Sequence, residues 1–263
     1  MRRFLLFSII LFTISLPTYA DILASVIMTK KLRVCIWPEY YGISYIEPRT
    51  QTLLGIDVDL AKELAQDLYV DITFIESSFS KLIADITQKR CDIAMFAIGR
   101  TPERLEYLHI TTPHLASDIY AITTKSNKRI QTWEDIDKEG VVVAVAKGTL
   151  HVTIMQERLL HAKLLIVDSL HAREQEVEAG RADVFMTDYP FGMRMMAQRE
   201  WAKLIKPSLP FHITPYGWGL DKTESAWKER VEQFIQTIQN DGRLYEAAKK
   251  HHLEPIIMRE KGL

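Results

Sequence analysis

An arginine placed at the start of a helix is the feature of this sequence that most directly suggests chemistry. The apolar run of residues 92–98 predicts a buried strand, after which Thr101 can cap a helix and Pro102 can open it. Arg104 then falls in the first helical turn, where the helix dipole disfavours a cation. Free amide donors and a planar guanidinium in one place suit a bound carboxylate. The simpler alternative is an exposed Arg104 paired with a neighbouring glutamate.

The elements before Arg104 alternate between strand and helix patterns. Residues 32–37, 70–75 and 92–98 are typical of strands, whereas residues 55–68 and 79–87 have helical patterns. This β-α-β-α-β order predicts a parallel sheet with right-handed crossovers, and such sheets bind ligands at the carboxyl ends of their strands. The residues expected at these ends, on one face, are Trp37, Tyr40, Gly99 and Arg104.

The pattern repeats in the second half of the chain. Residues 141–146, 163–167 and 182–187 have strand patterns, and helical patterns cover residues 150–160 and 169–179. We therefore expect a second β-α-β unit whose strand ends also face one way.

Two extended segments are expected to connect the units as a two-strand hinge. One lies near residues 113–123, and the other, punctuated by three prolines, runs over residues 206–217. These crossings predict a first lobe of residues 21–115 plus 215–263, and a second lobe of residues 116–214.

Several segments, in order, resemble the family 3 periplasmic solute-binding proteins, which are the amino-acid receptors of ABC importers. They are the strand and helix start of residues 92–104, the helix of residues 55–64, the strand of residues 180–188 and the helical break of residues 240–245. The resemblance spans about residues 30–255. It implies a two-lobed periplasmic-binding-protein fold, with two parallel-type sheets that carry helices on both faces, and a ligand in the cleft between the lobes.

The resemblance also implies the ligand's charged partners. An amino acid is a zwitterion, so both of its charges need partners in a dry cleft. Arg104 would take the carboxylate, and Asp188, on the other lobe, would take the ammonium group. Because the ligand bridges the lobes, closure would follow binding. The alternative role for Asp188 is an N-cap of the helix that follows it.

Four further residues follow from the resemblance. Gly148 and Thr149 match a stretch that donates to the carboxylate, Tyr40 matches an aromatic that covers the ligand, and Trp37 matches a position that recognises the side chain. The alternatives are a helix cap at Thr149 and simple packing of the two aromatic rings.

The sequence also departs from the family pattern. Gly99 stands where a serine or threonine hydroxyl would contact the carboxylate, and Leu150 replaces a second threonine. Phe96 stands where a small residue lines the pocket, and Arg100 adds a cation, unless it points to solvent. With Trp37 and Tyr40 near Phe96, we expect an apolar or aromatic amino acid, or a cationic one stacked on the rings.

Residues 1–20 have the layout of a secretory signal peptide: two arginines, an apolar run and a small-residue end. This pattern, rather than an uncleaved membrane anchor, predicts a secreted protein. Together with the resemblance, it implies a periplasmic protein that delivers its ligand to an inner-membrane ABC permease, and we expect a monomer.

Charge and composition exclude several other classes. With 33 basic and 34 acidic residues and no basic run, nucleic acid is not an expected partner. Neither metal-ligand spacing nor a phosphate-binding loop occurs, so we expect no cofactor and no metal. The two cysteines, Cys35 and Cys91, lie in strand-like contexts. We favour two buried thiols, with a disulfide as the alternative in an oxidising compartment.

Two other functions stay open. Cyclohexadienyl dehydratase, which acts on prephenate or arogenate, resembles these receptors, but such chemistry needs an additional proton donor or base. The nearby candidates are Glu39, Glu103 and His151, and none stands in a dedicated motif, so we predict no catalytic residue. The other alternative is a sensor or accessory module without a role in transport.

Overall fold

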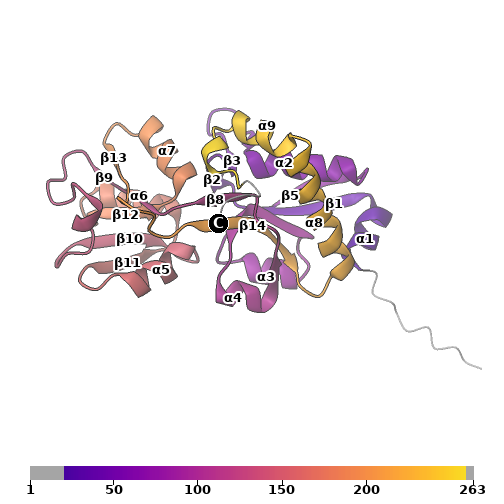
Figure 1. Cartoon of the computed structure of the whole chain (residues 1–263), viewed down its shortest axis with the longest axis horizontal. Helices are drawn as coiled ribbons and strands as arrows, with labels where there is room; N and C mark the ends of the chain where they lie inside the picture. Colours follow the sequence, from indigo (N-terminus) through magenta and orange to yellow (C-terminus); the bar gives the residue numbers. More distant parts are fainter. Residues whose placement is uncertain (1–20, 259–263) are drawn as a thin grey trace, which may run out of the picture.

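The protein is a two-lobed α/β molecule with one main β-sheet in each lobe (Figure 1). The computed structural model describes residues 21–258, so the signal peptide predicted at residues 1–20 lies outside the described residues. Helices cover both faces of each sheet, as expected for strands that are apolar on both sides.

The sheet of the first lobe has a parallel centre and an antiparallel edge. β1 pairs in parallel with β5 and β6, as the alternation predicts, whereas β14 runs antiparallel to β6 because the chain returns from the other lobe. Its strands are β5 (Asp71–Glu76), β1 (Lys31–Ile36), β6 (Ile93–Gly99), β14 (Thr214–Asp221), β7 (Leu108–Ile110) and β8 (Leu115–Ser117).

The helices of this lobe begin and end at residues suited to those positions. Thr101 caps α4 by accepting from the Arg104 amide, and Gly242, with φ 90°, separates α8 from α9. The helices are α1 (Ile22–Thr29), α2 (Ile56–Asp67), α3 (Leu82–Thr87), α4 (Pro102–Tyr107), α8 (Ser225–Asn240), α9 (Arg243–Lys250) and the 3-10 turn η2 (Glu254–Ile256). A small sheet of β2 (Glu39–Tyr40), β3 (Ser44–Ile46) and β4 (Leu53–Leu54) adjoins them.

The second lobe repeats the parallel centre with two antiparallel additions. β10 pairs in parallel with β11 and β12, and β9 runs antiparallel to both β12 and β13. The strands are β11 (Lys163–Val167), β10 (Val142–Ala146), β12 (Val184–Thr187), β9 (Tyr120–Thr124) and β13 (Ala202–Ile205). The helical elements are α5 (Leu150–Arg158), α6 (Leu170–Glu178), α7 (Tyr189–Gln198) and the turn η1 (Trp133–Asp135).

The two connecting segments lie side by side between the lobes (Figure 1). β8 pairs antiparallel with the start of β14, and Ser117 lies opposite Thr214. The connection is therefore two paired strands, which can bend together as one hinge.

The expectation of two free thiols was wrong. Cys35 and Cys91 form a disulfide, with their Cα atoms 5.6 Å apart. Cys35 lies in β1 and Cys91 lies just before β6, and these two strands are neighbours in the sheet. A buried strand context therefore does not argue against a disulfide, because neighbouring strands bring two such residues to bonding distance.

Candidate ligand-binding cleft

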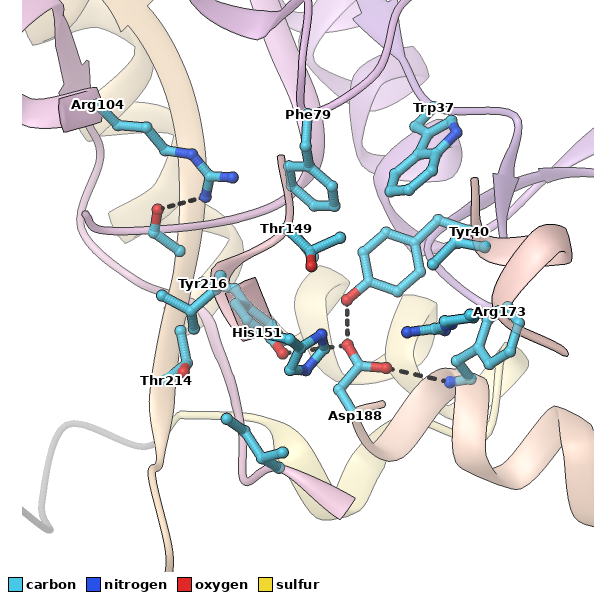
Figure 2. Close-up of a pocket in the computed structure, with 16 residues that line it drawn as sticks. Trp37, Tyr40, Phe79, Arg104, Thr149, His151, Arg173, Asp188, Thr214 and Tyr216 are labelled. Atoms are coloured by element: carbon cyan, nitrogen blue, oxygen red, sulfur yellow. Dashed lines mark hydrogen bonds between the residues drawn. The ribbon is translucent and has the colours of Figure 1, made fainter. Parts of the chain in front are cut away.

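One pocket lies between the lobes, at the carboxyl ends of the central strands (Figure 2). The first lobe and the returning strand β14 contribute aromatic rings, Arg104 and Thr214, and the second lobe contributes polar side chains and the apolar Leu150, Leu170 and Phe191. The pocket is lined by Trp37, Tyr40, Phe79, Ala97, Gly99, Arg104, Ile119, Thr149, Leu150, His151, Leu170, Arg173, Asp188, Phe191, Thr214 and Tyr216. Between residues 21 and 258, no three His, Cys, Asp or Glu side chains are placed to hold a metal.

Arg104 turns inward from the first turn of α4. Its side chain is 5% exposed, and its guanidinium lies 4.8 Å from the centre of the Phe79 ring. Nη1 donates to the Gly99 carbonyl at 2.8 Å, and Nη2 donates across the cleft to the Gly148 carbonyl at 3.0 Å. Burial lowers the pKa of Arg104 to about 10, which still leaves a cation at neutral pH. The exposed, glutamate-paired alternative for Arg104 is therefore wrong.

Asp188 has two roles at once. Its Oδ1 accepts from the Phe191 amide at 3.3 Å and so caps α7, as one of the two alternatives predicts. Its Oδ2 accepts from the hydroxyls of Tyr40 and Tyr216, the latter at 3.1 Å, and both tyrosines belong to elements of the first lobe (Figure 2). Burial raises the pKa of Asp188, although these donors and the charge of Arg173 act in the opposite direction.

Arg173 is a second buried guanidinium at the same pocket. It lies on α6, is 1% exposed, and packs against the rings of Phe185 and Phe191, at 4.8 and 4.5 Å from their centres. Nη1 donates to the Met186 carbonyl, whereas Nε has no hydrogen-bond partner among the described residues. Burial lowers its pKa to about 10. Arg173 was not predicted from the sequence, because nothing in its polar helical surroundings signals burial.

His151 lies at the same end of the pocket as Arg173 and Asp188 (Figure 2). Its pKa is lowered to about 3, first by burial and then by the charge of Arg173, so the ring is neutral. The ring donates to the Thr187 backbone, and Nδ1 has no partner within residues 21–258. A neutral imidazole that donates through Nε2 leaves Nδ1 as a bare acceptor, which suits an N–H group.

Thr214 restores a hydroxyl that Gly99 lacks. A Cβ atom placed on Gly99 would lie 2.8 Å from the methyl of Thr214, so the threonine occupies the space of a side chain at position 99. The Thr214 hydroxyl is buried without a partner in the described part of the chain. The two residues are distant in sequence, and only the pairing of β14 with β6 and β8 brings them together.

Aromatic rings form one wall of the pocket. Phe79 meets Trp37 edge to face at 4.9 Å between ring centres, and Phe96 packs behind Phe79 at 5.2 Å. Phe96 is fully buried and does not line the pocket, so the expectation that it enters the pocket was wrong. The next residue, Ala97, lines the pocket instead, because successive side chains along a strand point to opposite faces.

Ala97 adopts an unusual backbone conformation in β6. Its φ is +50°, a left-handed value that non-glycine residues rarely adopt. The Ala97 amide donates to Oδ2 of Asp57 at 2.8 Å, and Oδ1 of Asp57 accepts from the Trp218 indole at 2.9 Å. The buried Asp57 carboxylate therefore holds Ala97, which we call the floor of the pocket, in this conformation.

Six of the eight residues expected to bind the ligand line the pocket; these are Trp37, Tyr40, Gly99, Arg104, Thr149 and Asp188. Gly148 contributes its carbonyl to Arg104, and its φ of +75° and its approach to the Ser80 backbone leave no room for a side chain. Arg100 is exposed and does not line the pocket. The lining residues that the sequence analysis missed include Phe79, Arg173, Thr214 and Tyr216.

Several characterised proteins are similar to this chain. Cyclohexadienyl dehydratase of Pseudomonas aeruginosa is 29% identical over 226 residues, which cover 85% of this chain and 82% of that protein. The histidine-binding periplasmic protein of Escherichia coli is 26% identical over 211 residues, which cover 76% of this chain and 79% of that protein. The relatives found in these comparisons are mostly binding proteins rather than enzymes.

Solved structures show the same fold. The crystal structure of the ancestral amino acid-binding protein AncCDT-1, a precursor of cyclohexadienyl dehydratase, aligns with a TM-score of 0.79 and 26% identity over 87% of this chain and 98% of that one. A binding component of an ABC transporter from Wolinella succinogenes aligns with a TM-score of 0.77 and 24% identity over 84% and 95% of the two chains.

No helix in residues 21–258 is long and apolar enough to cross a membrane. The model of the bacterial extracellular solute-binding proteins, family 3, matches residues 32–254, which is most of the sequence. The chain belongs to this family of solute-binding proteins.

Proposed function

We propose that the chain captures a small amino-acid-like solute in the cleft between its lobes. The single observation that supports this is that Arg104 and Asp188, two buried and oppositely charged side chains from different lobes, line one pocket. Arg104 takes the α-carboxylate, with the Thr214 hydroxyl as a further donor. The Thr149 hydroxyl and amide already donate to the Ala146 carbonyl, so Thr149 lines the site without a free donor. Asp188 takes the ammonium group, and the bare Nδ1 of His151 accepts one of its hydrogens.

Binding and closure are coupled in this proposal, because the two charged ends of the solute meet different lobes. A ligand shifts a two-state equilibrium only by its differential affinity for the two states. In an open arrangement the solute reaches one charged partner, and in the closed arrangement it reaches both. The paired strands β8 and β14 supply a hinge about which this motion takes place.

We also propose that the protein acts in the periplasm as a monomer and delivers its solute to an ABC permease of the inner membrane. Membership of the solute-binding family and the signal-peptide pattern of residues 1–20 support this role. The similarity to a histidine-binding periplasmic protein supports an amino-acid-like ligand.

The test is a thermal-shift screen with the protein purified from cells that express the full chain. A ligand at a hundredfold excess over its dissociation constant stabilises the folded state by about 2.7 kcal/mol. We expect a shift with an amino acid, and we expect Arg104→Ala and Asp188→Ala to abolish it. Arg100→Ala and Asp168→Ala are the matched controls, because both residues are exposed and neither lines the pocket. Failure of every amino acid to shift the transition, or full binding by Arg104→Ala, would contradict the proposal.

A dehydratase is the second candidate, favoured by the similarity to cyclohexadienyl dehydratase. Such chemistry needs a proton donor or base in addition to the groups that anchor the substrate. Glu39 and Glu103 are exposed and line no part of the pocket, and the low pKa of His151 makes it a poor acid at neutral pH. We therefore expect no turnover of prephenate or arogenate in a direct dehydratase assay, and measurable turnover that Asp188→Asn abolishes would favour the enzyme.

A further inference from the structure

Unpartnered polar atoms are concentrated at the pocket. Among the described residues, the buried side-chain nitrogen and oxygen atoms without a hydrogen-bond partner belong to five residues: His114, His151, Arg173, Trp201 and Thr214. Three of these, His151, Arg173 and Thr214, line the interlobe pocket. A buried polar group without a partner destabilises a folded protein, so such a cluster indicates groups that a ligand satisfies.

The proposed function accounts for His151 and Thr214 but not for Arg173. Thr214 lies beside Gly99, at the Arg104 end, where it donates to the α-carboxylate. His151 accepts from the ammonium group at the other end. Arg173 lines the pocket, its Nε–H has no hydrogen-bond partner among the described residues, and a neutral amino acid offers this group no counterpart (Figure 2).

The charges that line the pocket do not balance. Arg104 and Arg173 contribute two positive charges and Asp188 contributes one negative charge. His151 is neutral, and burial holds the pKa values of Tyr40 and Tyr216 well above the ordinary value, so both phenols keep their protons. The lining therefore carries a net charge of about +1, and a zwitterion adds none. Burying an unbalanced charge is costly, so a closed, dry cleft favours a ligand that brings one further negative charge.

The carboxylate nearest to Arg173 along the chain does not remove this imbalance. Glu174, the next residue, pairs with Arg199 at 3.6 Å and lines a second pocket, which shares Leu170 and Phe191 with the interlobe pocket but is not lined by Arg173. The Arg173 guanidinium packs instead against Phe185 and Phe191, two rings that meet edge to face and carry no charge, which leaves its charge to be met from within the cleft.

We propose that the solute carries a second acidic group, which Arg173 binds through Nε–H, so that the ligand is an acidic amino acid. This inference rests on the proposed function, because it assumes that Arg104 and Asp188 hold the α-carboxylate and the ammonium group. It replaces the earlier expectation of an apolar, aromatic or cationic ligand. A cationic side chain would add a third positive charge beside two guanidinium groups, whereas an acidic one neutralises the pocket.

Calorimetry with matched acids and amides tests this inference. The probes are L-glutamate with L-glutamine and L-aspartate with L-asparagine, together with L-2-aminoadipate and L-arginine, added to the protein purified from cells that express the full chain. Truncating one partner of a buried charge pair costs about 2 kcal/mol or more, which is about 30-fold in affinity. We therefore expect one of the acids to bind at least about 30-fold more tightly than its amide or than L-arginine.

The variant Arg173→Gln should remove this preference. We expect its affinity for the acid to fall about 30-fold, while its affinity for the matched amide changes by less than about threefold. Arg181→Gln, an exposed arginine on the same lobe, is the control and should bind as the wild type does. If Arg173→Gln does not fold, as judged by circular dichroism, the acid-to-amide ratio of the wild-type protein decides the question.

Three results would overturn the inference. An amide or L-arginine that binds more tightly than every acid would do so, and so would an Arg173→Gln variant that keeps the wild-type ratio. In both cases the proposed function stands if Arg104→Ala still abolishes binding. Failure of all these amino acids to bind would overturn the inference and the proposed function together.

Discussion

The two lobes each place one buried arginine against the cleft, and they hold it in different ways. Arg104 and Arg173 both contact phenylalanine rings and both donate to backbone carbonyls. However, Arg104 also reaches the Gly148 carbonyl of the opposite lobe, whereas the contacts of Arg173 stay within the second lobe. Separation of the lobes would therefore remove the Gly148 partner of Arg104 and leave the contacts of Arg173 in place. The contacts of Arg104 thus depend on closure of the lobes, whereas those of Arg173 do not.

The scaffolds behind these two arginines differ as well. The first lobe fixes its half of the pocket with a disulfide and with a left-handed residue, Ala97, that Asp57 holds. The second lobe uses the uncharged His151 ring and the aromatic pair around Arg173. We therefore expect the two halves to respond to different perturbations.

The largest expected effect is on the first lobe. The disulfide joins residues 56 positions apart, and in the chain-entropy treatment such a loop contributes about 4 kcal/mol to the free energy of unfolding. The double variant Cys35→Ser and Cys91→Ser should lose about this amount, measured by denaturant unfolding. Hydrogen exchange should locate the loss in β1, β5 and β6. Equal loss of protection in β10 and β12 would show instead that the lobes unfold as one unit.

An intermediate effect is expected in the second lobe. The pKa of His151 is about 3 in the folded protein and its ordinary value is 6.5, so the unfolded chain binds more protons between these values. Stability should therefore fall as the pH drops below about 6.5, by about 1.4 kcal/mol for each pH unit. Urea unfolding at pH 7 and pH 5 should show a loss of about 2 kcal/mol that His151→Gln reduces. His161→Gln, on an exposed residue, is the control, and an unchanged pH dependence in His151→Gln would count against the buried neutral ring.

The smallest expected effect concerns the floor of the pocket. Left-handed backbone costs a non-glycine residue about 1 kcal/mol, so Ala97→Gly should raise the free energy of unfolding by about 0.5–1 kcal/mol despite the added flexibility of the unfolded chain. Ala94→Gly, in the same strand, should lower it by about 0.5–1 kcal/mol, since Ala94 does not have a positive φ. Thermal unfolding of the two variants measures the contrast. If Ala97→Gly and Ala94→Gly destabilised the protein equally, the backbone of Ala97 would carry no strain that a glycine relieves.

The sequence predicted the alternation of strands and helices, and with it the positions of Arg104 and Asp188. These elements have strong local patterns: apolar runs, the Thr101 cap and the helix start after Asp188. Residues defined by long-range pairing were missed. Thr214 and Tyr216 reach the pocket because β14 returns antiparallel to β6, and local patterns carry no information about that pairing.

The disulfide and Arg173 were missed for related reasons. Cys35 and Cys91 have ordinary strand contexts, and only the adjacency of β1 and β6 brings them together. Arg173 lies in a helix with mostly polar neighbours, so its burial depends on where Phe185 and Phe191 pack. A charged side chain can thus be a core residue without any sign of it in the surrounding sequence.

The two phenol groups that donate to Asp188 also determine what an observed affinity would mean. Tyr40 and Tyr216 are tethered to the same molecule as the carboxylate, so they compete with any incoming ammonium group at a high effective concentration. Binding of a solute would then exchange hydrogen-bond donors at Oδ2 of Asp188, rather than add a donor to an oxygen that has none. Weakly donating solutes would lose this competition and dissociate quickly, so the tyrosines would act as an internal threshold against solutes that lack a strong cationic donor.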